Sequence, residues 1–169
     1  TFDNIEELRK IKEYCDTAKL LLRLKVPDSG SLVELGSKFG AEISDSDKLL
    51  SAAKDMGLDI KGISFHVGSQ CLNFDNFSNS LEIAADILYN SGKWKEQLEI
   101  VDIGGGFPAL YYQHNTDFEK LADIINFDCQ RLFSSNIQFI AEPGRFVVAN
   151  AGVLITEIIG KSRREGKIY

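Results

Sequence analysis

The sequence contains few cysteines and has no metal-binding pattern. Only three cysteines occur among the 169 residues, and none forms a CxxC pair or a cluster with histidine. A chain of this length can bury roughly 70% of the surface that its unfolded form exposes, so a hydrophobic core can form without disulfides. We therefore expect reduced thiols at Cys15, Cys71 and Cys129, no metal site and a cytoplasmic location.

Excess positive charge and long apolar runs are also lacking. The formal net charge is -6 and the pI is about 5.0, so no basic surface is expected to attract the phosphates of a nucleic acid. No apolar run approaches the ~20 residues of a membrane helix, and no signal peptide is recognisable. We expect neither nucleic acid nor a membrane as a partner. The chain opens at Thr1, directly before a helical pattern, so we expect it to be part of a longer protein.

What the sequence does contain is an alternation of apolar runs and amphipathic segments. Strands are predicted over four runs about 40 residues apart, and each gap holds a helical pattern, which is the repeat of a parallel α/β sheet. The predicted strands cover residues 18–26, 60–67, 98–103 and 137–141, and the helices cover residues 4–15, 44–56, 75–88 and 117–133.

Four further local expectations follow from the sequence. Asp3 is predicted to cap the first helix. The nearly continuous apolar run at 18–26 is typical of a strand buried on both faces. Residues 27–37 mix turn-forming residues and predict a loop, whereas the apolar residues 152–159 predict a further strand.

Length leaves two architectures open. A closed (β/α)₈ barrel usually takes about 250 residues, so this chain would form only the second half of one. An open, doubly wound Rossmann-like sheet fits 169 residues better, and length alone favours it.

Polar and glycine-rich clusters directly follow three of the apolar runs. These clusters are HVGSQ at residues 66–70, GGGF at residues 104–107 and EPGR at residues 142–145. Ligands of parallel α/β proteins bind beyond the carboxyl ends of the strands, so the three clusters predict one wall of a binding site.

Each cluster has a functional and a structural interpretation. The glycine run is either a phosphate cradle or a tight turn. His66 either stacks on a planar ligand, with Ser69 donating to a phosphate, or is a structural histidine. Glu142 and Arg145 form either a surface ion pair or a functional pair. In the functional case, a partly buried carboxylate needs a cation such as a ring nitrogen, and the guanidinium holds a phosphate.

Arg23 lies in the middle of the apolar run LLLRLKV. An arginine is costly to bury without a partner, so we expect it to meet a carboxylate or to point into a site.

The clusters also carry a resemblance to a known family. The segments TFDNIEEL, KLLLRL, SKFGAEI, GISFHVGSQ, VDIGGGFP and IAEPGRFVVA resemble the fold-type III pyridoxal-phosphate decarboxylases, most closely the ornithine decarboxylase group. The matches run in family order across nearly the whole chain. HVGSQ is also similar to a motif of diaminopimelate decarboxylases.

The resemblance implies roles for individual residues. Glu142 would pair with the pyridinium nitrogen of pyridoxal 5'-phosphate (PLP), and His66 would stack on its ring, which makes these two the expected catalytic residues. Lys38 would form a salt bridge across a dimer interface. The remaining expected cofactor-binding residues are Arg23, Ser69, Gly105, Gly106, Gly144 and Arg145.

The resemblance also implies a fold and an activity. The fold would be the second half of an alanine-racemase-like (β/α)₈ barrel over residues 1–160, with residues 161–169 leading to a β-domain. The protein would be a cytoplasmic homodimer that converts ornithine to putrescine in polyamine biosynthesis. In the family, the lysine that binds PLP covalently and a β-domain cysteine complete the site. Neither has a counterpart in residues 1–169, so this segment is expected to be inactive alone.

Other functions remain open at this point. The chain could belong to a non-catalytic homologue of the antizyme-inhibitor type, which binds a regulatory protein such as antizyme. It could equally belong to a decarboxylase of lysine, arginine or diaminopimelate, or to a small PLP carrier protein. A Rossmann-like nucleotide binder fits least well, because no acidic residue lies at the spacing that would hold a ribose.

Overall fold

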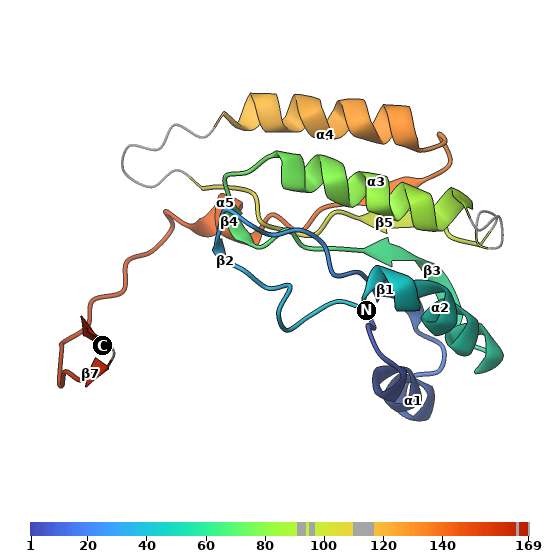
Figure 1. The fold of residues 1–169 in the computed structure, drawn as a ribbon, viewed down its shortest axis with the longest axis horizontal. Coiled ribbons are helices and arrows are strands. Elements are labelled where there is room, and N and C mark those ends of the chain that lie inside the picture. Colours follow the sequence, from blue (N-terminus) through green and yellow to red (C-terminus); the bar gives the residue numbers. More distant parts are fainter. Residues whose placement is uncertain (91–93, 95–96, 110–116, 165, 169) are drawn as a thin grey trace.

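The computed structural model describes residues 1–90, 94, 97–109, 117–164 and 166–168. Its centre is a four-stranded parallel sheet in the order β1-β3-β5-β6 (Figure 1). The strands are β1 (Lys19–Arg23), β3 (Asp59–Ser64), β5 (Ile100–Asp102) and β6 (Gln138–Ile140). Each lies within a run predicted to be a strand or overlaps it closely, so the predicted parallel α/β sheet is confirmed.

Helices alternate with these strands along the chain. They are α1 (Ile5–Tyr14), the short 3₁₀ turn η1 (Ile43–Asp45), α2 (Ser46–Asp55), α3 (Asp75–Asn90), α4 (Phe118–Leu132) and α5 (Gly144–Val148). The four long helices match the predicted ones, whereas the short α5 was not expected from the sequence.

The predicted cap of α1 is wrong by one residue. The side chain of Asn4 caps the helix by accepting the Glu7 N–H at 2.8 Å. Asp3 instead accepts the N–H of Gly40 at 2.9 Å, a residue distant in sequence. Both side chains offer an acceptor oxygen near the start of the helix, and the tertiary contact decides between them.

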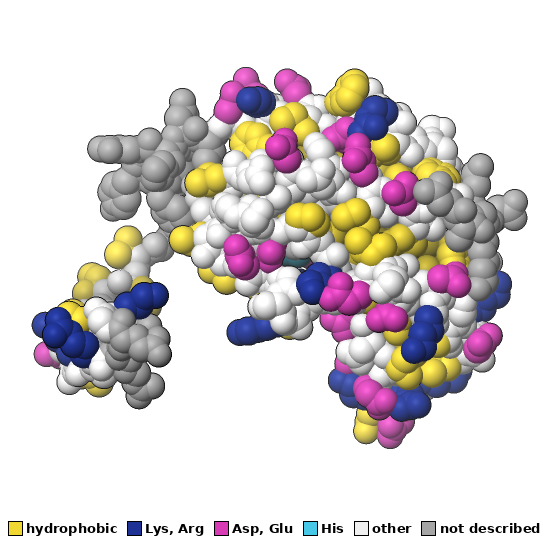
Figure 2. Space-filling model, viewed as in Figure 1, with side chains coloured by type: hydrophobic (Ala, Val, Ile, Leu, Met, Phe, Trp, Pro, Cys, Tyr) yellow, Lys and Arg dark blue, Asp and Glu magenta, His cyan; other side chains and the backbone are white. Residues whose placement is uncertain are grey.

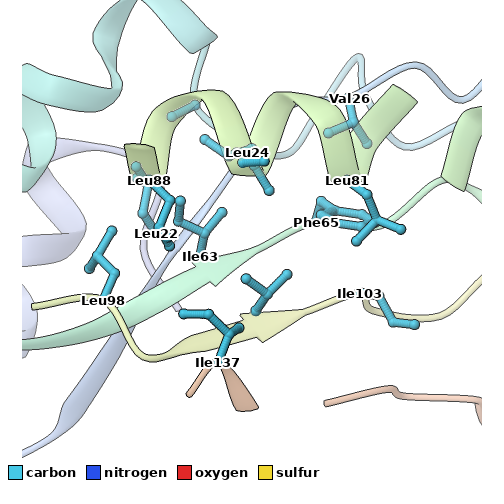
Figure 3. Close-up of a cluster of buried hydrophobic side chains, with 14 of the residues drawn as sticks. Leu22, Leu24, Val26, Ile63, Phe65, Leu81, Leu88, Leu98, Ile103 and Ile137 are labelled. Atoms are coloured by element: carbon cyan, nitrogen blue, oxygen red, sulfur yellow. The ribbon is translucent and has the colours of Figure 1, made fainter. Parts of the chain in front are cut away.

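One face of the sheet forms the hydrophobic core. Apolar side chains of the strands pack against the helices, as Leu22 of β1 and Ile63 of β3 beside Leu81 and Leu88 of α3 illustrate (Figure 3). The largest fully buried members of this core are Trp94, Phe2, Phe65, Phe77, Leu8, Leu22, Leu24, Leu50, Ile63, Leu81, Leu88 and Leu98.

The opposite face of β1 is only half-buried, and this corrects the expectation that residues 18–26 are buried on both faces. In β1 the buried Leu20 and Leu22 alternate with Leu21 and Arg23, which are half-buried. Arg23 pairs in register with Ser64, and Ser64 with Asp102. Because residues in register on neighbouring strands point to the same face, these three form one polar row on the face opposite the hydrophobic core.

A small antiparallel pair connects the loop after β1 to the first polar cluster. β2 (Ser31–Val33) pairs with β4 (Ser69–Cys71). The prediction that residues 27–37 are only a loop is therefore partly wrong, because this strand forms through a partner almost 40 residues away, which local sequence does not reveal. A second small pair joins β7 (Arg163–Arg164) to β8 (Lys167–Ile168).

The strand predicted over residues 152–159 is not observed. This segment leads away from the body of the protein without forming a strand (Figure 1), and Figure 2 shows hydrophobic side chains along it. A strand needs a neighbour for its backbone hydrogen bonds, and no described segment pairs with this one. Its apolar side chains are 76% to 96% exposed, namely Val153, Leu154, Ile155, Ile158 and Ile159.

The close approach of β3 to β5 gives a test of this fold. A Cβ atom on Gly62 would lie 1.9 Å from the carbonyl oxygen of Ile100, at a point where the pairing of β3 with β1 also shifts in register. Gly62→Ala should lower the free energy of unfolding by about 1–3 kcal/mol, as overpacking does. Gly152→Ala is the matched control, because no atom lies within 4 Å of its added methyl group. Urea unfolding followed by circular dichroism measures both, and equal midpoints would contradict the close approach.

Candidate cofactor site

The three polar clusters meet at one end of the sheet. His66, Gly104 and Glu142 each lie two residues beyond a set of strand residues that pair in register, Ser64, Asp102 and Ile140. The chain stays in register past the strands, since the N–H of Glu142 donates to the carbonyl of Gly104 at 2.8 Å. Three segments that are far apart in sequence thus lie side by side.

Glycine makes this convergence possible. Gly104 has a φ of +63°, and a Cβ on it would lie 2.0 Å from the carbonyl oxygen of Phe65. A Cβ on Gly105 would lie 2.8 Å from the carbonyl oxygen of Glu142 and 2.9 Å from His66 Nε2. The space between the imidazole and the Glu142 backbone is thus open only because residue 105 has no side chain, which favours the functional interpretation of the glycine run.

The surroundings of His66 favour a neutral imidazole. Its Nδ1 accepts the N–H of Gly68 at 3.1 Å, which leaves Nε2 to carry the proton. Burial lowers the pKa of His66 below its ordinary 6.5, and the positive charge of Arg23 lowers it further, while Glu142 opposes both. An uncharged, half-buried ring is suited to lie against a flat ligand.

A second part of the site collects donors for an anion. Arg145 Nε donates to Ser69 Oγ at 3.1 Å, which joins the EPGR cluster to the HVGSQ cluster. Gly106 has a φ of +99° and packs so tightly that a Cβ would lie 2.4 Å from the carbonyl oxygen of Gly68. Backbone amides of the glycine loop, a hydroxyl and a guanidinium therefore lie in one region, and all three are phosphate donors.

The polar row beneath these clusters was only partly expected from the sequence. Ser64 Oγ is buried without a hydrogen-bond partner, and it is the one such side-chain atom in the described part of the chain. Asp102 is buried and accepts the N–H of Gly104 at 2.8 Å. Burial and the charge of Glu142 raise the pKa of Asp102, while the Gly104 hydrogen bond opposes them. These residues were missed because only the strand register places them beside Arg23.

The expected site residues are unequally covered. Glu142 and Arg145 are exposed, which for Glu142 corrects the expectation of partial burial, because it follows β6, the edge strand of the sheet formed by the described residues. Gly144 begins α5, and no atom would lie within 4 Å of a methyl group added to it. Lys38 is exposed in the turn before Phe39, whose ring lies 5.0 Å from the Arg23 guanidinium carbon.

An apolar cavity of about 290 Å³ lies behind the site, between α4 and α5. Its lining includes Phe107, Phe118 and Phe146 but none of the residues expected to bind the cofactor. It therefore belongs to the packing of the helices. No group of three or more His, Cys, Asp or Glu side chains that could hold a metal ion occurs among the described residues. Within the same residues, no helix has the length and apolar character needed to cross a membrane.

Comparison with known proteins identifies the family. Residues 1–149 match the pyridoxal-dependent decarboxylases, in their pyridoxal-binding domain. The chain belongs to this decarboxylase family. The expected resemblance is confirmed.

Several relatives are similar along almost the whole chain. A probable ornithine decarboxylase of Dictyostelium discoideum is 38% identical over 161 residues, which cover 95% of this chain and 34% of the relative. Antizyme inhibitor 2 of Xenopus laevis is 36% identical over 170 residues, which cover 99% of this chain and 37% of the relative. The chain thus spans little more than a third of the length of the curated relatives it matches.

Solved structures of decarboxylases share the fold. The arginine decarboxylase of Paramecium bursaria Chlorella virus, bound to agmatine, superposes with a TM-score of 0.82 at 33% identity, over 99% of this chain and 45% of that one. A lysine/ornithine decarboxylase of Vibrio vulnificus, complexed with putrescine, gives a TM-score of 0.76 at 34% identity, over 98% and 43%. The expected partial (β/α)₈ barrel is confirmed, and the doubly wound architecture that length favoured is not the one observed.

The surroundings of His66 predict its titration. The chain has two histidines, so replacing His114, which lies outside the described residues, leaves one imidazole signal for NMR. Its midpoint should lie below 6.5, and Arg23→Met should raise it because a repelling charge is removed. The folded state takes up this proton at lower pH than the unfolded chain does. The contribution of His66 to the free energy of unfolding should therefore decline as the pH falls from 6.5 toward the lowered pKa. A midpoint above 6.5 would contradict the neutral imidazole.

Proposed function

We propose that this chain is the cofactor-binding part of a PLP-dependent amino-acid decarboxylase that converts ornithine to putrescine. The observation that carries the proposal is the convergence of His66, Glu142 and the Arg145–Ser69 pair around the glycine loop. Ornithine as the substrate is supported by the ornithine decarboxylases among the relatives, at 36–38% identity.

The residues present fit PLP, which combines a flat cationic ring with a phosphate. PLP supplies, when bound, a protonated ring that accepts the electron pair left by the departing carboxylate. Glu142 would hold the proton on the ring nitrogen, because a carboxylate stabilises the adjacent positive charge. An arginine in this position would oppose that charge, so Glu142 favours decarboxylation over racemisation.

The neutral imidazole of His66 would lie against the ring face. A protonated imidazole would repel a cationic ring, and the burial that lowers the pKa of His66 favours the neutral form. The phosphate would be held by Ser69, the Gly105 and Gly106 amides, Gly144 and the Arg145 guanidinium. Arg23 would lie close to the cofactor, in the row beneath His66.

Broader expectations belong to the same proposal. Residues 1–160 would form the later part of the PLP-binding barrel, and residues 161–169 would lead toward a β-domain. We propose a cytoplasmic homodimer in which Lys38 contributes an ion pair at the interface. The exposed position of Lys38 and the three free cysteines support this.

A second candidate function is that of an antizyme inhibitor. The 36% identity to antizyme inhibitor 2 over 99% of this chain favours it directly. Such a protein would keep this fold and bind antizyme without decarboxylating an amino acid. Release of CO₂ from ornithine, with lysine, arginine and diaminopimelate as comparisons, separates the two functions.

Replacing Glu142 tests the role of its carboxylate. In the full-length protein, Glu142→Ala should keep PLP bound but lower kcat for decarboxylation by 10²-fold or more, if holding the ring proton contributes about 3 kcal/mol. The matched control is Glu13→Ala, which removes an exposed carboxylate from α1 and should leave kcat unchanged. A Glu142→Ala kcat within a few-fold of the parent would overturn this role.

Replacing Arg145 tests the phosphate contact separately. Arg145→Ala should weaken PLP binding, measured by equilibrium dialysis, by about tenfold or more, since a charge-assisted hydrogen bond contributes about 1.5–3 kcal/mol. Lys48→Ala on α2 removes an equal charge from an exposed position and serves as the control. Unchanged affinity in Arg145→Ala would argue against a phosphate contact.

A further inference from the structure

Gln70 has an unusual backbone conformation next to the proposed phosphate site. Its φ is +56°, and it is the one residue other than glycine with a positive φ in the described ranges. Residues other than glycine rarely adopt a backbone conformation with a positive φ. Gln70 is also buried, with 9% of its surface exposed. An unfavourable backbone conformation persists only where the surrounding structure stabilises it. The contacts of the Gln70 side chain therefore indicate what holds the residue in place.

The side-chain amide of Gln70 forms two hydrogen bonds with the backbone of a single residue in the glycine loop. Its Nε2 donates to the carbonyl of Ala109 at 2.7 Å, and its Oε1 accepts the N–H of Ala109 at 2.9 Å. A donor and an acceptor are both required, so the orientation of the amide is determined by its partners. We refer to this pair of hydrogen bonds as the Gln70 clamp.

The clamp joins the two loops that carry the expected phosphate donors. Ser69 directly precedes Gln70, and the glycine loop runs from Gly104 to Ala109. A third bond crosses the same gap, because the N–H of Cys71 donates to the carbonyl of Gly106 at 2.9 Å. The clamp thus closes the loop beyond Gly106 and keeps the Gly105 and Gly106 amides beside Ser69 and its partner Arg145.

We propose that Gln70 is a positioning residue for the phosphate site, acting through the Ala109 backbone to hold the glycine loop against Ser69. This inference rests on the proposed PLP binding and assigns to Gln70 a role in affinity for the phosphate group. A glycine would supply the positive φ with less strain, but it could not make the clamp. The position therefore combines an unfavourable conformation with two hydrogen bonds that only an amide of this length provides.

Two variants separate the clamp from the backbone conformation. Gln70→Met keeps the length and burial of the side chain but removes both hydrogen bonds. Gln70→Gly also removes them, while it relieves the strain of the positive φ. The matched control is Ser80→Ala in α3, which removes a buried hydrogen bond to the carbonyl of Asn76 far along the chain from the glycine loop.

The measurement compares ligands with and without a phosphate. Dissociation constants of PLP and of pyridoxal are determined for the apo form of the full-length protein, together with its thermal unfolding midpoint. We expect both Gln70 variants to bind PLP about tenfold more weakly, a change of about 1.4 kcal/mol. Pyridoxal binding should change less than about twofold, and Ser80→Ala should lower the unfolding midpoint without changing either constant.

Three results would overturn the inference. Equal losses for PLP and pyridoxal would show a general disturbance of the site. Unchanged PLP affinity in Gln70→Gly, with a loss only in Gln70→Met, would show that the backbone conformation matters and the clamp does not. A parent protein that binds neither ligand would overturn the proposed function itself, and this inference with it.

Discussion

The register of β3, β5 and β6 is the constraint on which the site depends. Parallel pairing sets Ser64 beside Asp102 and Asp102 beside Ile140. The residues two places further on, His66, Gly104 and Glu142, therefore meet beyond the carboxyl ends of the strands. The bond from the Glu142 N–H to the Gly104 carbonyl extends this pairing past the strands. A shift of one residue in any pair would turn the functional side chain toward the helices, because successive side chains alternate between faces.

The alternation of side chains along each strand places the hydrophobic core on one face of the sheet and the polar residues near the candidate site on the other. Apolar side chains of the strands point toward the helices and supply the core, whereas the opposite face carries the row of Arg23, Ser64 and Asp102. On that face Asp102 accepts the N–H of Gly104, and the Arg23 guanidinium lies over the Phe39 ring. In contrast, Ser64 Oγ is buried without a partner. A free buried hydroxyl is costly in a core but is appropriate beside a site that binds a polar ligand.

Periodicity and the position of polar clusters sufficed to predict the four parallel strands, the four long helices and the meeting of the three motifs. Features that depend on contacts distant in sequence were not predictable. The β2–β4 pair forms across almost 40 residues, and Asp3 leaves the helix cap to bond Gly40. Residues 152–159 have the composition of a strand, but none of the described strands pairs with them. Strand propensity describes side chains that fit a sheet and does not show that a neighbouring strand is present.

The exposure of Glu142 has a consequence for its electrostatics. Two unit charges 4 Å apart attract by about 1 kcal/mol in water, but by about 4 kcal/mol at the effective dielectric constant of about 20 that is typical near a protein surface. An exposed carboxylate is therefore a weak partner for a cation until water is displaced from it. In the proposed function, a flat ligand with Glu142 on one side and His66 and the glycine loop on the other would displace that water. The attraction of the carboxylate for a cationic ring would then strengthen on binding, so the exposure of Glu142 is compatible with its proposed role.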